Sequence, residues 1–149
     1  MNVKSALVCL ILLFVPHLAL SAQKEWIVFV LPPTIETKQE VKTIPAGWVA
    51  LLEAVPNQIA GITVFDGRPE QKASLVPDNE EQHKAENRLV VTWQLAPLSP
   101  EGIWLTFSYA STSVVLAKPL PQGATELRVT YDTSVTISGM NEIVRVEYR

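Results

Sequence analysis

A small set of reactive side chains decides what chemistry this chain could support. Nucleophilic catalysis of the Ser–His–acid kind needs a histidine base, and after residue 22 the chain offers only His83. His83 lies in a charged stretch with no ordering pattern around it, so we interpret it as a solvated loop histidine. One histidine without cysteine does not supply a zinc site, and the six scattered glycines form no phosphate-binding loop. We therefore predict no catalytic, metal-binding or cofactor-binding residues, and no cofactor.

Paired carboxylates are the remaining route to catalysis, since glycoside hydrolysis requires two acids across a cleft. Asp66 precedes Gly67 in a predicted strand-ending turn, where aspartate is favoured for local hydrogen bonding. Asp132 follows the apolar Tyr131 in the same kind of position. We interpret both aspartates as turn residues, and a carboxylate-dependent hydrolase of envelope polysaccharide stays an alternative function.

Exposed aromatic side chains near loops are typical anchors for binding. Trp26 and Trp93 fall in apolar runs, which predicts core positions for both. Trp104 is out of phase with its apolar neighbours and is expected on the other side of its sheet. Trp48 follows a Pro-Ala-Gly turn and is expected to be partly exposed. Packing is the simpler interpretation of each.

One polar stretch interrupts the apolar pattern, from Asp78 to Arg88, and it contains four carboxylates. We expect it to be a solvent-exposed loop with one helical turn. If the protein binds a basic partner, residues 78–86 are the region to test, because opposite charges steer association.

The apolar residues repeat with a period of two, which places one face of each strand in a core and the other in water. Connections rich in Pro, Gly, Asn and Asp fall between the strands. This pattern predicts an all-β fold, a single antiparallel β-sandwich or barrel-like domain of about eight to ten strands. The expected strands are Trp26–Leu31, Lys38–Ile44, Trp48–Leu52, Ile59–Phe65, Ala73–Val76, Leu89–Leu95, Ile103–Tyr109, Val114–Leu116, Leu127–Tyr131 and Val144–Tyr148.

Residues 1–22 have the composition of a secretory signal peptide. Lys4 precedes an apolar run from Ala6 to Val15, and small residues lead to an expected cleavage after Ala22 or Ser21. The run is shorter than the roughly 20 residues that cross a bilayer, and Pro16 interrupts it. We therefore expect a periplasmic or secreted bacterial protein with no membrane span after cleavage.

The remaining chain, residues 23–149, is mildly acidic and free of cysteine. It keeps all 15 acids and 11 of the 12 bases, for a net charge of about −4. Such a chain has no basic patch to neutralise phosphates, which excludes nucleic acid as the expected partner. Its length of about 127 residues is enough for one domain without disulfides, and no second domain is indicated.

Several short motifs, spread over nearly the whole of residues 23–149, resemble an uncharacterised family of small exported bacterial proteins. The run from Ile62 to Glu70 and then Ala73 to Pro77 carries part of the resemblance. The family's pattern is Cys-Pro-x-x-Ile, Gly-Trp, Asp-Gly-x-Pro, Trp-x-x-Cys-x-Tyr, Leu-Pro-x-Gly, Cys-x-Val-x-Tyr-Asp and a terminal Cys. The further matching positions are Pro32–Ile35, Gly47–Trp48, Trp104–Tyr109, Leu120–Gly123, Leu127–Asp132 and Tyr148.

This chain departs from that pattern at the family's cysteines. The four positions hold the apolar residues Leu31, Phe107, Leu127 and Tyr148. Losing a disulfide costs roughly 2–5 kcal/mol, and burying a large apolar side chain returns about 1.5–3 kcal/mol. We hypothesise that the four residues meet in two buried pairs, with the pairing left open. The resemblance implies the fold class and an envelope location, and no activity.

The missing catalytic apparatus, the export signal and the β domain together predict a non-enzymatic binding or interaction module in the periplasm. An inhibitor or immunity-type protein is a concrete sub-case, because small rigid acidic β domains suit that task. The alternatives are the carboxylate-dependent hydrolase and a structural subunit of an envelope complex. The subunit would show an exposed apolar patch or an unpaired edge strand.

Overall fold

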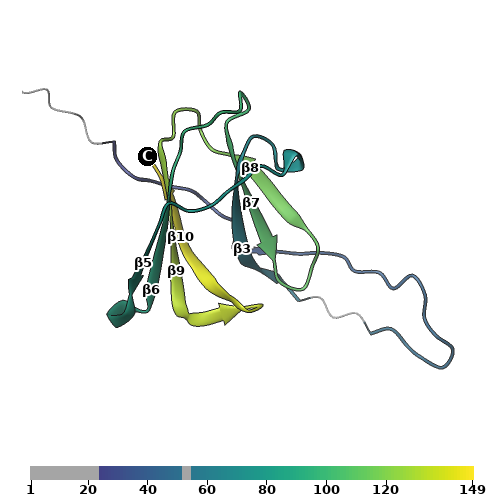
Figure 1. Ribbon diagram of the computed structural model, residues 1–149. Coiled ribbons are helices and arrows are strands. Elements are labelled where there is room, and N and C mark those ends of the chain that lie inside the picture. Colours follow the sequence, from purple (N-terminus) through teal and green to yellow (C-terminus); the bar gives the residue numbers. More distant parts are fainter. Residues whose placement is uncertain (1–23, 52–54) are drawn as a thin grey trace, which may run out of the picture.

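The computed structural model describes residues 24–51 and 55–149 (Figure 1). The predicted signal peptide, residues 1–22, lies outside the described residues. The described part of the chain forms two antiparallel sheets of five strands each, which pack around one core and confirm the predicted all-β sandwich.

The first sheet has the strand order β1 (Ile27–Val28), β10 (Met140–Tyr148), β9 (Glu126–Ile137), β6 (Arg88–Gln94) and β5 (Asn79–His83). The second has the order β2 (Thr34–Ile35), β3 (Asn57–Asp66), β7 (Ile103–Tyr109) and β8 (Val115–Pro119), with β4 (Ser74–Leu75) also paired to β3. Two single-turn 3₁₀ helices are present, η1 (Pro69–Gln71) and η2 (Lys84–Glu86). Strands β5 and β8 are therefore edge strands.

The core lies between the sheets and follows the predicted alternation. Its fully buried side chains come from β3 and β7 of one sheet and from β9 and β10 of the other: Val64, Leu105, Leu127, Val129 and Val146. In β6 and the residue after it, Val91, Trp93 and Leu95 are buried, while Gln94 is exposed. A period of two thus assigned these strands to the correct face.

Strand β10 breaks the predicted alternation. Val144 was expected on the core face but is exposed, whereas Ile143 and Val146 are buried. The register shifts between Ile143 and Arg145, so Val144 occupies a bulge. A bulge adds one residue to one strand, and everything before it changes face.

The predicted loop from Asp78 to Arg88 is wrong in part. Residues Asn79–His83 form β5, which pairs with β6 from Asn79 opposite Thr92 to His83 opposite Arg88. All five residues of β5 are exposed. An edge strand needs backbone partners on one side only, so it forms here without a buried apolar face. The expected helical turn is present as η2.

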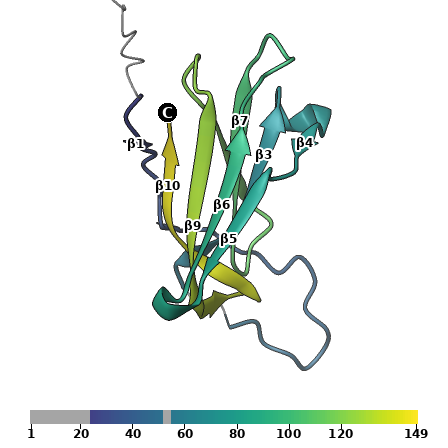
Figure 2. The ribbon, with the colours of Figure 1, turned by 60° about the vertical axis from the view of Figure 1, so that its left-hand side comes forward.

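Two predicted strands, Lys38–Ile44 and Trp48–Leu52, are not strands in the described residues. Residues 36–51 form an extended loop, which we call the arm, and it projects from the sandwich in Figures 1 and 2. Residue 52 lies outside the described residues. Pro45 lacks a backbone N–H and cannot donate a hydrogen bond to a neighbouring strand. Residues 36–51 pair with neither sheet of the described chain.

Trp26 is half-buried and does not join the core, contrary to the prediction. Its ring lies between two guanidinium groups, 4.0 Å from that of Arg128 and 4.6 Å from that of Arg149. Trp26 precedes the short β1, which pairs with only two residues of β10. The following Phe29 is buried and packs at 5.8 Å from Phe107.

The four positions at which the resemblance expects cysteine lie in or against the core. Phe107 and Leu127 are buried, while Leu31 and Tyr148 are partly buried and pack against the core. Tyr148 lies opposite Leu127 across β9 and β10. The hypothesis of two buried pairs stays a prediction.

Candidate interaction surfaces

The histidine that catalysis would require is fully on the surface. His83 ends β5, and its Nε2 lies 3.8 Å from a carboxylate oxygen of Glu81, also exposed. A general base must be held within hydrogen-bond reach of the proton that it takes. An exposed ring beside an exposed carboxylate does not provide that geometry.

Asp66 has a structural task that bridges distant segments. It ends β3, and its carboxylate accepts hydrogen bonds from the backbone N–H groups of Leu98 at 3.0 Å and Ser99 at 3.1 Å. The predicted hydrogen-bonding role holds, but the segment that it binds is the β6–β7 loop and not its own turn. This carboxylate therefore holds a loop in place.

Asp132 lies inside β9 and not in a turn after a strand, so that prediction was wrong in position. Its carboxylate accepts hydrogen bonds from the Ser134 hydroxyl at 2.6 Å and the Ser134 N–H at 2.9 Å, and pairs with Arg88. The Ser134 hydroxyl and N–H, with Arg88, lower the pKa of Asp132. A glycosidase general acid needs a raised pKa, so the shift at Asp132 has the opposite direction to that required.

Two other carboxylates on the sheets are paired with arginines. Glu126 pairs with Arg149, and the buried Glu147 pairs with both Arg128 and Arg145. Within the described ranges, no group of three His, Cys, Asp or Glu residues is placed to hold a metal ion. This arrangement of the carboxylates does not favour the hydrolase.

Two tryptophans are hydrogen-bonded within the fold. Trp93 is buried and its indole N–H donates to the Leu75 carbonyl, and the indole N–H of Trp104 donates to the Glu101 carbonyl.

The acidic hairpin, Asp78–Arg88, presents charge along an edge of the first sheet. Arg88 forms an ion pair with Asp132, so its positive charge is balanced within the sheet. Glu80 and Glu86 are exposed. Burial, and then the nearby negative charge of Glu80, raise the pKa of Tyr131 to about 12. Among the described residues, β6 is the single neighbour of β5 in the sheet, so the outer edge of β5 has no strand partner there.

The arm presents a different kind of surface. Its side chains include Trp48, 74% exposed, and Leu51, 87% exposed, with Val49 also exposed between them. Packing was the simpler interpretation of Trp48, with partial exposure as the alternative, and the structure shows the exposed side chain. Val49 and Leu51 were assigned to a strand. The signal that could have corrected this was the run Trp48–Leu51 itself, which has no polar residue at alternate positions.

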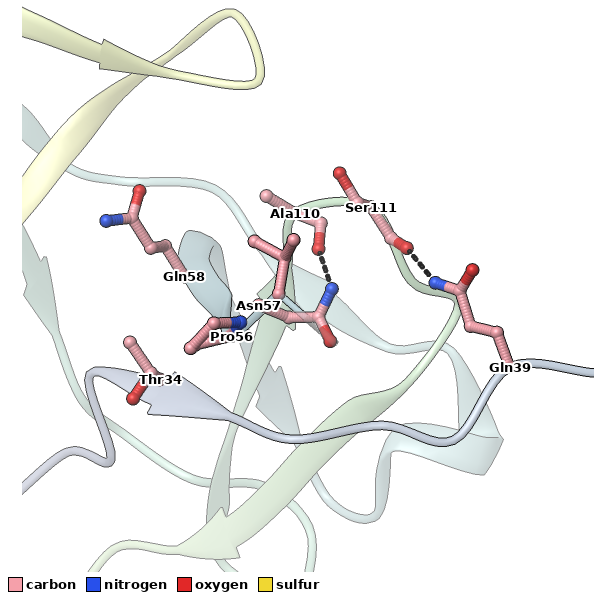
Figure 3. A pocket seen from close by; sticks show the side chains of 8 residues that line it. Thr34, Gln39, Pro56, Asn57, Gln58, Ala110 and Ser111 are labelled. Carbon is pink, nitrogen blue, oxygen red and sulfur yellow. Dashed lines mark hydrogen bonds between the residues drawn. The ribbon is translucent and has the colours of Figure 1, made fainter. Parts of the chain in front are cut away.

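The base of the arm is fixed by hydrogen bonds (Figure 3). The amide of the buried Asn57 donates to the Ala110 carbonyl at 2.7 Å. It also accepts a hydrogen bond from the Thr37 hydroxyl at 2.7 Å. Gln39 donates to the Ser111 carbonyl at 3.1 Å. A pocket of about 710 Å³ lies here, lined by Thr34, Gln39, Val55, Pro56, Asn57, Gln58, Ala110 and Ser111.

The tip of the arm contains a tight turn. The Trp48 N–H donates to the Pro45 carbonyl at 3.1 Å, and Gly47 has a φ of 83°. A positive φ at the third residue of such a turn favours glycine. The turn therefore sets the direction in which the chain presents Trp48.

The acidic hairpin and the arm lie at the same end of the sandwich. In both Figure 1 and Figure 2, η2 and the arm point toward the lower end, where the β9–β10 hairpin also ends. The β6–β7 loop, which is hydrogen-bonded to Asp66, lies at the opposite end. One end of the molecule thus combines exposed acids with exposed apolar side chains.

Comparison with known proteins gives one family match. The family model described as type VI secretion system Tli immunity protein matches residues 54–145, more than half of the chain. No curated protein and no solved structure matches the chain. No helix among the described residues is long and apolar enough to cross a membrane.

Proposed function

Since this chain belongs to the type VI secretion system Tli immunity protein family, we propose that it neutralises a toxic type VI effector by binding it in the periplasm. It is an immunity-type interaction module and binds a protein partner. The periplasm is the proposed location because residues 1–22 have the composition of a secretory signal peptide. Family membership is the single observation that carries the proposal.

The same surface features fit an interaction module and a structural subunit of an envelope complex. Both need an exposed apolar patch or an open strand edge, and this chain has both. The family decides in favour of the immunity protein, because its members are described by that role.

Co-production tests the proposal directly. Each type VI effector of the same bacterium is directed to the periplasm of a susceptible cell, with or without this chain carrying residues 1–22. We expect survival with one effector when the chain is exported, and death when residues 1–22 are deleted. Survival with neither version, across all effectors, would overturn the proposed function. Equal survival with and without residues 1–22 would overturn the proposed periplasmic location.

The acidic hairpin is the surface that we propose steers the effector. Opposite charges raise association rates, and salt screens the effect. The double variant Glu80→Lys/Glu86→Lys should slow association about tenfold at low salt and much less at high salt. The matched control Glu25→Lys/Glu70→Lys makes the same change in net charge at exposed acids outside the hairpin. Equal slowing by both pairs would show that net charge, and not the hairpin, controls the rate.

A further inference from the structure

The tip of the arm is an uncharged apolar surface on a projecting loop. No charged residue occurs from Thr43 to Leu51. Trp48, Val49 and Leu51 are all at least 74% exposed, and Ile44 is about half exposed. Isolated exposed apolar residues are ordinary, but a tryptophan with three aliphatic neighbours on one loop marks a contact site.

The arm is held in place at its base and shaped at its tip. Asn57 links the Thr37 hydroxyl to the Ala110 carbonyl, and Gln39 binds the Ser111 carbonyl. The turn at Pro45–Trp48 fixes the backbone position that carries the indole of Trp48. A loop ordered before binding loses less conformational entropy when it docks, which favours its use as an anchor.

The shape and chemistry of the arm define the surface that it fits. A convex, uncharged tip is complementary to a concave, apolar surface, and exposed tryptophan is enriched among residues that dominate binding energy. The acidic hairpin lies at the same end but on the other side of it (Figure 1), so it adds a separate charged surface. A flat or strongly basic surface would suit the hairpin alone.

We propose that the arm is the anchor for the effector, and that Trp48 and Leu51 insert into an apolar cleft of it. The proposal rests on the proposed function. The acidic hairpin then controls the rate at which the effector associates, and the arm controls the rate at which it dissociates. Truncating an anchor changes dissociation more than association.

Binding kinetics with the neutralised effector test this assignment. The probe is the purified effector against which the wild-type chain protects, inactivated for handling. Trp48→Ala and Leu51→Ala should each weaken binding by roughly 30-fold or more, chiefly through faster dissociation. The matched control is Leu98→Ala, since Leu98 is 92% exposed on the β6–β7 loop at the opposite end. It should change binding by less than about twofold.

A spectroscopic measurement separates contact from indirect effects. The chain has four tryptophans, so 5-fluorotryptophan labelling gives four ¹⁹F resonances, and Trp48→Ala identifies the one from Trp48. Adding the effector should shift the Trp48 resonance most. An unmoved Trp48 resonance in the saturated complex would overturn the proposal, whatever the affinities of the variants.

The outcomes distinguish the two proposals. If the effector binds the wild type and both arm variants equally, the arm is not the anchor and the proposed function stands. If no effector is neutralised, the proposed function fails and the arm proposal fails with it. If the wild type is a dimer that Trp48→Ala converts to a monomer with unchanged effector binding, the arm contacts a second copy and the proposal is overturned.

Discussion

The β-sandwich and the arm are both rich in apolar residues, yet one buries them and the other exposes them. Leu127 of β9 is completely buried, whereas Leu51 of the arm is 87% exposed. Strand β9 has hydrogen-bonded neighbours on both sides, β10 and β6. The arm has no strand neighbour in the described part of the chain, and its contacts are at its base.

This difference shows that apolar content does not by itself produce burial. A strand buries its side chains when its backbone hydrogen bonds are satisfied by neighbours and its apolar residues share one face. In the arm, apolar residues follow one another without alternation, and a proline interrupts the run. Side chains left exposed in this way are available to another molecule.

The largest effect should come from comparing the two leucines directly. Leu127→Ala should lower the free energy of unfolding by about 2–5 kcal/mol, because it leaves a cavity in the core. Leu51→Ala should change it by less than about 0.5 kcal/mol, because the side chain is 87% exposed. Urea denaturation followed by circular dichroism measures both.

Phe107→Ala extends this test to another position at which the resemblance expects cysteine, and should cost about 3–5 kcal/mol. Unchanged stability in both Phe107→Ala and Leu127→Ala would refute the hypothesis that buried apolar residues replace the disulfides here.

Two glycines with positive φ sharpen the comparison at the level of the backbone. Gly67 has a φ of 94°, and a Cβ there would lie 2.9 Å from the Ser99 hydroxyl oxygen. Gly67→Ala should therefore destabilise the fold by about 1–3 kcal/mol, through strain and a steric clash.

Gly47 has a φ of 83°, and a Cβ added there would meet nothing within 4 Å. Gly47→Ala should cost at most about 1 kcal/mol, because the arm tip can relax without disturbing the sheets. Thermal unfolding of the two variants under one set of conditions gives the difference. Equal losses would mean that the arm is as tightly coupled to the fold as the β3 turn.

Two tryptophans offer a smaller contrast. Trp26 is held between Arg128 and Arg149, and each cation–π contact at such a site contributes about 0.5–1 kcal/mol. Trp26→Ala should lower stability by about 1–2 kcal/mol. Trp48→Ala should leave stability within about 0.5 kcal/mol, while it weakens effector binding. Chemical denaturation together with binding measurements checks the pair, and a reversal of the order would contradict it.

The smallest effect concerns the point at which the acidic hairpin joins the sheet. Hydrogen bonds from Ser134, with the ion pair to Arg88, hold the pKa of Asp132 below its usual range. Its contribution to stability is therefore present at neutral pH. It is lost as the pH falls below the unfolded-state pKa and through the lowered folded-state pKa.

Asp132→Asn should reduce the urea midpoint at pH 7, and the difference from wild type should shrink as the pH falls from about 5 toward about 2. Glu70→Gln, on an exposed carboxylate of η1, controls for the loss of one negative charge. A difference that stays constant with pH would show that the contacts of Asp132 do not depend on its charge.

Most of the sandwich could be predicted, because the alternation of apolar and polar residues within a strand indicates which face of that strand is buried. Alternation placed Leu105, Phe107 and Tyr109 on the buried face, as found. It failed at Val144, since a bulge depends on the register of the neighbouring strand and leaves no mark in the alternation of β10 itself. It also missed β5, whose backbone pairing with β6 needs no apolar residue.

The candidate surfaces were predicted less completely. The acids of the hairpin could be seen from the residues. Partial exposure of Trp48 was only the alternative to packing, and the structure exposes it. The arm could not be predicted, because a short apolar run is interpreted as a strand. Only the tertiary structure shows that no neighbouring strand pairs with its backbone. Asp66 shows the same limit, since its hydrogen-bond donors lie more than 30 positions away in the chain.

By itself, the sequence determined the fold class, the acidic net charge and the faces of the long strands other than β10, since these depend on composition and on a period within one segment. The tertiary structure alone decided that the acidic stretch is an edge strand, that Trp26 lies between two arginines, and that the arm projects from the sandwich. These features depend on which distant segments meet, and no local pattern specifies such a meeting.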